Sequence, residues 1–170
     1  MSRSDQRVPE WIQDQVPPTP RSGSGTYLRH MPNDLSQFRT ALVVEPDRDL
    51  AEIYSLLLRR EGISRVVIAQ TGTEALALAL TRTPDLILTE VALPNLDGVA
   101  LLRKLREDPR ARGAAVVVIT ARSGALLQRH AADLGVAMLL EKPISLRTLA
   151  GTLRAGLAHF AAARPEGEAS

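Results

Sequence analysis

The chain has 170 residues, of which 45% are hydrophobic and 24% charged, which is enough for one globular domain with an adequate core. It contains no cysteine, which excludes disulfides and thiolate metal sites. No apolar run approaches the roughly 20 residues of a membrane-spanning helix, and the N-terminus lacks a secretion signal, so we expect a cytoplasmic protein. The net charge is +2 with scattered arginines and only 3% aromatic residues, so neither nucleic acid nor membrane is an expected partner.

Residues 1–38 differ in composition from the rest of the chain. They hold five of the eleven prolines and the run RSGSG at 21–25, and they show no sustained apolar periodicity. This composition predicts a disordered N-terminal arm. The segment around Trp11, the only tryptophan, has two possible interpretations: a short segment that docks on a partner, or a leader without a binding role. At the other end, residues 163–170 are expected to form a short flexible tail.

Residues 39–162 alternate between two kinds of segment. Unbroken aliphatic runs without in-out alternation are typical of strands buried on both faces of a parallel sheet. The helical segments between them would provide the crossovers that parallel strands need. The pattern predicts one α/β domain with a doubly wound, five-stranded parallel sheet. The predicted strands are residues 41–44, 65–69, 85–88, 114–119 and 136–140.

The first helix is expected directly after the first strand. Leu50, Ile53, Tyr54 and Leu57 form the apolar stripe of an amphipathic helix, and Gly62 suits its left-handed end. We therefore expect these four side chains to face the sheet.

The next two helices are predicted from their caps. Thr71 and Glu74 form a capping box before the run ALALAL. That run alternates every two residues, like a strand, but its alanines, the cap and the following Pro84 favour a helix. Asp97 is expected to cap the helix after the third strand.

The last two helices are predicted to begin at serines. Ser123 would cap a helix that ends at Gly135, and His130 lies on its inward stripe, which indicates a packed histidine rather than a ligand. Ser145 would begin the final helix, whose leucines recur at helical spacing. We expect no output domain after this helix.

Polar residues stand where four of the predicted strands end. The first strand ends at Glu45, the third at Glu90, the fourth at Thr120, and Lys142 follows the fifth. Ligands of doubly wound sheets bind outside the carboxyl ends of the strands, so these side chains are expected at one edge. Carboxylates suit a hard metal ion, while a hydroxyl and an ammonium suit phosphate oxygens.

Four motifs in order, LVVEPDRDL, PDLILTEVALPNLDG, VVVITAR and LLEKP, resemble the receiver domain of two-component response regulators over residues 40 to about 161. The resemblance implies a flavodoxin-like fold with strand order 2-1-3-4-5. It places Glu90 at the phosphoryl-accepting aspartate, and Thr120 and Lys142 at the positions that sense the phosphate. It also implies a cis bond before Pro143.

The chain departs from the family pattern at three places. The acidic pair that helps to bind Mg²⁺ in the family falls on Glu45 and Pro46, and proline has no ligand group. Glu90 carries its carboxylate one methylene, roughly 1.5 Å, further than aspartate does, and a displacement near 1 Å can cost about a hundredfold in rate. Leu139 falls on the aromatic switch position. These changes indicate a degenerate pseudo-receiver that is not phosphorylated, not an enzyme, and without a cofactor.

The expected function is therefore that of a stand-alone receiver domain that regulates a signalling protein by contact: a histidine kinase, an output protein or another regulator. Glu90 is expected to reach toward Lys142 and Thr120, which would either mimic the phosphorylated state or form a silent ion pair. The resemblance implies a partner or homodimer face at about residues 123–160, including Leu139 and Arg147.

Two other functions are compatible with parts of the same pattern. The first is a phosphorylatable single-domain regulator with weak Mg²⁺-dependent activity, using Glu90 or Asp47. The second is an enzyme on a similar fold. A flavin carrier would need a Gly-rich loop after the first strand, and a phosphatase an aspartate at Glu45, and the sequence offers neither.

Overall fold

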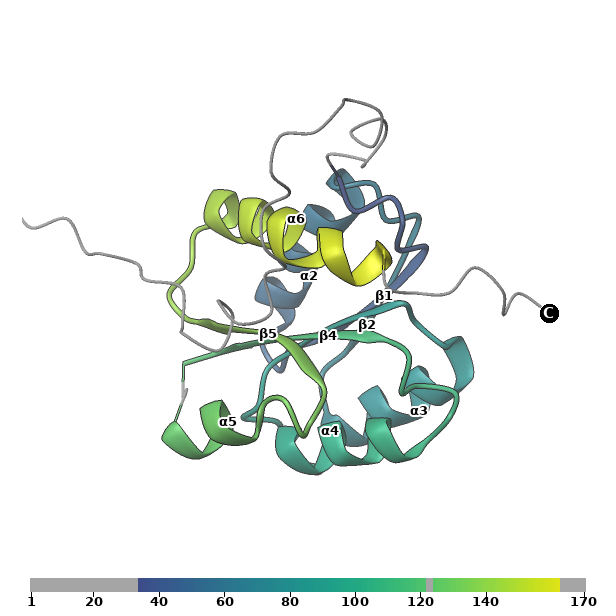
Figure 1. Ribbon diagram of the computed structural model, residues 1–170, viewed down its shortest axis with the longest axis vertical. Helices are drawn as coiled ribbons and strands as arrows, with labels where there is room; N and C mark the ends of the chain where they lie inside the picture. Colours follow the sequence, from purple (N-terminus) through teal and green to yellow (C-terminus); the bar gives the residue numbers. More distant parts are fainter. Residues whose placement is uncertain (1–33, 122–123, 163–170) are drawn as a thin grey trace, which may run out of the picture. The chain divides into compact units, whose positions relative to one another are not determined.

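The computed structural model describes residues 34–121 and 124–162, and within them five strands form one parallel sheet (Figure 1). The strand order is β2-β1-β3-β4-β5, which confirms the predicted fold class and strand order. Each predicted strand agrees with the observed one to within one residue. The strands are β1 (Thr40–Val44), β2 (Arg65–Ala69), β3 (Leu86–Thr89), β4 (Ala115–Thr120) and β5 (Val136–Glu141).

Helices cover both faces of the sheet. Figure 1 shows α2 and α6 on one face and α3, α4 and α5 on the other. Every residue of β3 and β4 is buried, as expected for central strands covered on both sides. The helices are α2 (Arg48–Arg60), α3 (Gly72–Arg82), α4 (Gly98–Glu107), α5 (Ala125–His130) and α6 (Leu146–Ala162).

Side chains that alternate along the strands divide between two apolar cores. Val43 and Leu88 pack with Leu58 of α2 and Leu153 of α6 on one side of the sheet. On the other side, the neighbouring strand residues pack against α3, α4 and α5. The two cores fix the sheet between the helices, so the strand ends that carry the polar residues are held in place.

Side chains cap four of the helices, three of them as predicted. Asp47 and Asp97 each accept a hydrogen bond from the amide three residues ahead, at 3.0 and 2.9 Å. Thr71 does the same at 3.1 Å, but Glu74 accepts the amide of Gln70 at 2.9 Å, one residue earlier than in a capping box. The Oγ of Ser145 accepts the Thr148 amide at 3.1 Å.

The predicted inward stripe of α2 is partly wrong. Tyr54 is buried as expected, but Ile53 is 41% exposed. Buried residues of α2 lie one position further along the chain than predicted, at Ala51, Ser55 and Leu58. Ala51 and Ser55 lie on the buried side of the helix, and the helical repeat then places Ile53 on the outward side.

The prediction for α5 is wrong at both ends. Its N-cap is Gly124, with no side-chain hydrogen bond, and Ser123 lies outside the described residues. The helix ends at His130, whose side chain is exposed and lies 3.6 Å from the Asp133 carboxylate. Ala131 and Leu134 supply enough apolar surface on the inward side, so the polar imidazole at its margin faces water.

The domain boundary falls earlier than the sequence predicted. Leu35 and Phe38 are fully buried in the core on the α2 side. The Leu35 amide also donates to the Glu61 carbonyl oxygen at 2.7 Å. The rest of the predicted arm, residues 1–33, and the predicted tail lie outside the described residues.

Two glycines differ in the space that surrounds them, which leads to opposite predictions for the stability of their alanine variants. A Cβ on Gly72 would overlap the backbone carbonyl of Leu96, whereas a Cβ on Gly151, inside α6, would meet nothing within 4 Å. Gly72→Ala should therefore lower the free energy of unfolding by about 2 kcal/mol or more through overpacking. Gly151→Ala should raise it by roughly 0.5–1 kcal/mol, because alanine favours the helix. Urea unfolding of both variants measures this, and destabilisation of similar size in both would contradict it.

Candidate functional site

The polar residues at the strand ends meet at one edge of the sheet, as predicted. Glu45 follows β1, Glu90 follows β3, Thr120 ends β4 and Lys142 follows β5. Glu45, Glu90 and Thr120 are all buried. The peptide bond between Lys142 and Pro143 is cis, as the resemblance implied.

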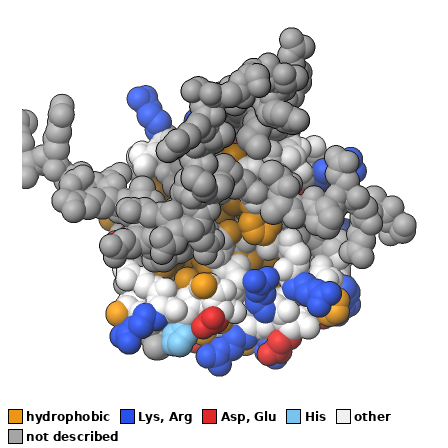
Figure 2. All heavy atoms as spheres, viewed as in Figure 1, with side chains coloured by type: hydrophobic (Ala, Val, Ile, Leu, Met, Phe, Trp, Pro, Cys, Tyr) orange, Lys and Arg blue, Asp and Glu red, His pale blue; other side chains and the backbone are white. Residues whose placement is uncertain are grey.

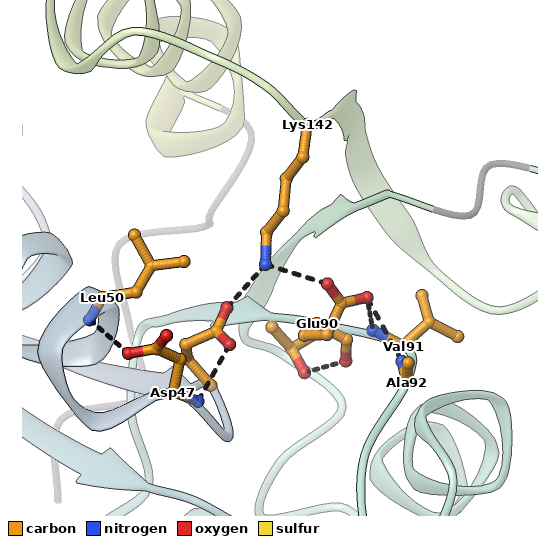
Figure 3. A network of polar contacts seen from close by, with 8 residues as sticks. Asp47, Leu50, Glu90, Val91, Ala92 and Lys142 are labelled. Carbon is orange, nitrogen blue, oxygen red and sulfur yellow. Dashed lines mark hydrogen bonds and ion pairs between the residues drawn. The ribbon is translucent and has the colours of Figure 1, made fainter.

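Lys142 joins the two carboxylates. Figure 3 shows its side chain extending from the end of β5 toward Glu90. The Nζ atom lies 2.8 Å from Oε2 of Glu45 and 3.0 Å from Oε2 of Glu90, and the Lys142 side chain is 21% exposed. One ammonium therefore contacts two buried carboxylates, and this set of three residues is called the carboxylate–lysine cluster below.

The remaining oxygen of Glu90 is held by the loop that follows it. Its Oε1 accepts the amides of Val91 at 2.6 Å and of Ala92 at 3.2 Å (Figure 3). The Thr120 hydroxyl also forms a hydrogen bond with this carboxylate. The expected contacts of Glu90 with Lys142 and Thr120 are thus both present, and both of its carboxylate oxygens are engaged.

These contacts determine the charge states. Burial by itself raises the pKa of Glu90, but hydrogen bonds from Thr120, Lys142 and the two loop amides outweigh it and lower the pKa below its ordinary value. Burial likewise lowers the pKa of Lys142, and the contacts with Glu45 and Glu90 outweigh it and raise that pKa. Glu90 and Lys142 are therefore both charged at neutral pH.

A pH prediction follows from the direction of the Glu90 shift. A carboxyl whose pKa is lower in the folded state stabilises the fold above its unfolded pKa, near 4.5, and loses this contribution as the pH falls. The natural chain should therefore lose stability below about pH 4.5 more steeply than a Glu90→Gln variant does. Urea midpoints measured from about pH 7 to about pH 3 would test this. Parallel curves would contradict the prediction.

The donor set does not fit a magnesium ion of the kind that the resemblance implies. Both carboxylates contact the Lys142 ammonium, and the neighbour of Glu45 is Pro46, whose carbonyl oxygen accepts the Gln70 side chain at 3.4 Å. Asp47 points its carboxylate to the Leu50 amide as a helix cap. In the described part of the chain, no three acidic, histidine or cysteine side chains gather closely enough to hold a metal ion.

Some neighbours of the site were missed by sequence reasoning. Tyr54 was predicted only as a core residue, but burial and then the charges of Glu45 and Glu90 raise its pKa despite the opposing effect of Lys142. Tyr54 lies on α2, the helix that directly follows β1, and this position was the sequence signal that could have placed it near the site. The amides of Val91 and Ala92 were also missed, because backbone donors leave no mark on residue type.

The two residues predicted for the partner face lie in different environments. Leu139 is half-buried and packs against the core on the α4 side of the sheet, whereas Arg147 is exposed in the first turn of α6.

A search of the described helices for a membrane-spanning segment found none with the length and apolar character that such a segment needs.

The family comparison agrees with the fold. The model of the response regulator receiver domain matches residues 41–154. The DNA-binding response regulator MtrA of Mycobacterium tuberculosis is 34% identical over 116 residues, 68% of this chain and 49% of that protein. A response regulator receiver protein of Anaeromyxobacter is 38% identical over 64% of this chain and 44% of its own length. The chain thus spans about half the length of these relatives.

Solved structures show the same fold. A CheY-like receiver domain protein of Methanospirillum hungatei has a TM-score of 0.65 at 24% identity, covering 72% of this chain and 95% of that one. The signal receiver domain of a histidine kinase from Syntrophus aciditrophicus has a TM-score of 0.62 at 28% identity, covering 77% and 96%. The chain therefore belongs to the response regulator receiver domain family.

Proposed function

We propose that this receiver domain regulates a signalling partner through protein contact, without accepting a phosphoryl group. The observation that carries the proposal is the carboxylate–lysine cluster, in which Lys142 lies within 3.0 Å of both Glu45 and Glu90. In-line phosphoryl transfer depends on a positioned acceptor and on metal ions that neutralise the developing charge. Here the acceptor is a longer side chain that is already hydrogen-bonded, and the metal position offers a proline.

The cluster supports a fixed state of the domain. Glu90 engages Thr120 and Lys142, the two residues that the resemblance assigns to sensing the phosphate. A carboxylate brings about one negative charge, against nearly two for a phosphoryl group, so the mimicry is partial. The strand ends are held by these contacts without a covalent modification, and the domain would present one surface to its partner at all times.

The surface formed by α5, β5 and α6 is the face proposed for that partner. It carries Arg147 and the 44% exposed Leu146 in the first turn of α6. A protein partner, such as a histidine kinase, an output protein or another regulator, suits this combination better than nucleic acid does. Figure 2 shows basic side chains interspersed with acidic ones over α4 and α5, rather than a continuous basic patch.

Phosphoryl labelling tests the proposal. The natural chain is incubated with acetyl phosphate and Mg²⁺, and its intact mass is measured beside that of a Pro46→Asp, Glu90→Asp variant as the positive control. No phosphoryl adduct is expected on the natural chain. A hydroxylamine-sensitive adduct at Glu90 or Asp47 of the natural chain would refute the proposal and favour a weak, Mg²⁺-dependent phosphoacceptor.

A further inference from the structure

The outward face of α2 carries apolar side chains that the fold does not cover. Leu56 is 66% exposed and Ile53 is 41% exposed, although both lie in the middle of a 13-residue helix. Leu56 points directly away from the buried side, which consists of Ala51, Tyr54 and Leu58. An apolar centre of this kind on a helix face is typical of a contact surface.

Two exposed charges of opposite sign lie near the two ends of the same face. Asp49 lies in the first turn and Arg60 in the last turn, and both are exposed. Within the described residues, the side chains of Asp49 and Arg60 form no ion pair with any other group. The neighbouring Arg59 differs, because its guanidinium donates to the Val66 carbonyl oxygen of β2 at 3.1 Å.

This pattern is complementary to itself when the helix is reversed. One midpoint, between Tyr54 and Ser55, relates Asp49 to Arg60 and also relates Ile53 to Leu56. Two copies of α2 packed antiparallel about a two-fold axis at that midpoint would place each aspartate against an arginine of the other copy. The same axis would pack the isoleucine of each copy against the leucine of the other, as an isologous interface requires.

We propose that the exposed face of α2, formed by Asp49, Ile53, Leu56 and Arg60, binds the same face of a second copy of this chain in antiparallel orientation. This surface belongs to α2 alone, whereas the face proposed for the signalling partner is formed by α5, β5 and α6. A 13-residue helix is about 20 Å long, and one helix pair buries less than the roughly 800 Å² per partner of a stable interface. The dimer is therefore weak and concentration-dependent.

Sedimentation velocity of the full chain, from micromolar to roughly 1 mM, tests the dimer with two matched variants. Leu56→Glu places a charge at the centre of the interface and should weaken dimerisation at least about tenfold. Leu146→Glu makes the same change on the α5–β5–α6 face and should leave dimerisation unchanged. A chain that stays monomeric throughout, or a dimer lost only in Leu146→Glu, would overturn the proposal.

Charge reversal tests the antiparallel orientation. Asp49→Arg alone places two arginines against one another and should weaken the dimer, and Arg60→Asp alone places two aspartates together. The double variant Asp49→Arg, Arg60→Asp restores both pairs with exchanged signs and should recover most of the affinity. Far-UV circular dichroism of each variant controls for helix content. Absence of rescue in a folded double variant would contradict this orientation.

A single introduced thiol gives an independent readout, because the natural chain contains no cysteine. Leu56→Cys lies close to the two-fold axis and should form an intermolecular disulfide faster than Leu146→Cys does under the same mild oxidation. Equal rates at the two positions would indicate random collision and would count against the α2 dimer.

Discussion

Replacing Lys142 with methionine is expected to lower the free energy of unfolding by about 2–4 kcal/mol at neutral pH, because it leaves buried carboxylates without their counter-charge. Methionine keeps the length and apolar stem of the side chain, so the loss of the ammonium is the main change. Glu45 and Glu90 are both buried, and both are within 3.0 Å of the lysine Nζ. Urea unfolding measures the loss.

The pH dependence of the Lys142→Met variant identifies the cause. Two like charges in one site raise the pKa of a carboxyl in the folded state, so the folded variant binds a proton more readily than the unfolded chain. Its stability should therefore fall as the pH rises above the ordinary glutamate value of 4.5. The natural chain should show no such fall, because its Glu90 pKa is lowered and the stabilisation by Glu90 is complete above that value.

Arg154→Met is the matched control for this variant. Arg154 contacts Glu61 at 2.8 Å across α6 and the end of α2, but it is more exposed than Lys142 and serves one carboxylate. Its loss should cost less than that of Lys142, about 1–2 kcal/mol, since the Arg154 side is 37% exposed and water screens the pair there. If the two substitutions cost the same and show the same pH dependence, the shared lysine has no special role.

The second large effect is a gain of activity in the Pro46→Asp, Glu90→Asp variant. Aspartate at 90 withdraws the carboxylate by roughly 1.5 Å, and aspartate at 46 adds a metal ligand beside Glu45. Labelling by acetyl phosphate with Mg²⁺ should be at least about a hundredfold faster than in the natural chain, which is the rate cost of a displacement near 1 Å. Quenched-flow or timed intact-mass measurements give the rates.

The two single variants separate the contributions. Glu90→Asp alone should label slowly because the metal position remains incomplete, and Pro46→Asp alone should label little because its acceptor stays too long. A double variant as inert as the natural chain would show that the block lies elsewhere, for example in the contact between Glu45 and Lys142. Labelling without Mg²⁺ would argue against the role given to position 46.

Much of the fold was predictable because its signals are local. The five buried strands stand out as unbroken aliphatic runs, and Thr71 and Asp97 each cap a helix where expected. The meeting of Glu90, Thr120 and Lys142 was also predictable, since parallel strands end at one edge. The likeness of four motifs to receiver domains supplied the assignment of these positions.

The remaining features depend on tertiary packing. In α2, the small residues Ala51 and Ser55 are buried while Ile53 is exposed, which the apolar stripe alone does not reveal. The early end of α5 reflects burial by Ala131 and Leu134 rather than helix propensity. The double engagement of Lys142 depends on side-chain conformations at the ends of three strands, and residue spacing does not specify these.

The most direct test of the carboxylate–lysine cluster is an NMR titration of the natural chain with Mg²⁺ followed by acetyl phosphate, monitoring the amides of Val91, Ala92 and Thr120. The Val91 and Ala92 amides donate to Glu90, and the Thr120 side chain binds it, so any metal or phosphoryl group at this carboxylate must shift their signals. The cluster predicts no saturable shift in the natural chain and clear shifts in the Pro46→Asp, Glu90→Asp variant. Saturable shifts at these amides in the natural chain would show that a metal ion or phosphoryl group displaces Lys142 from Glu90. Phosphorylation would then still control the domain.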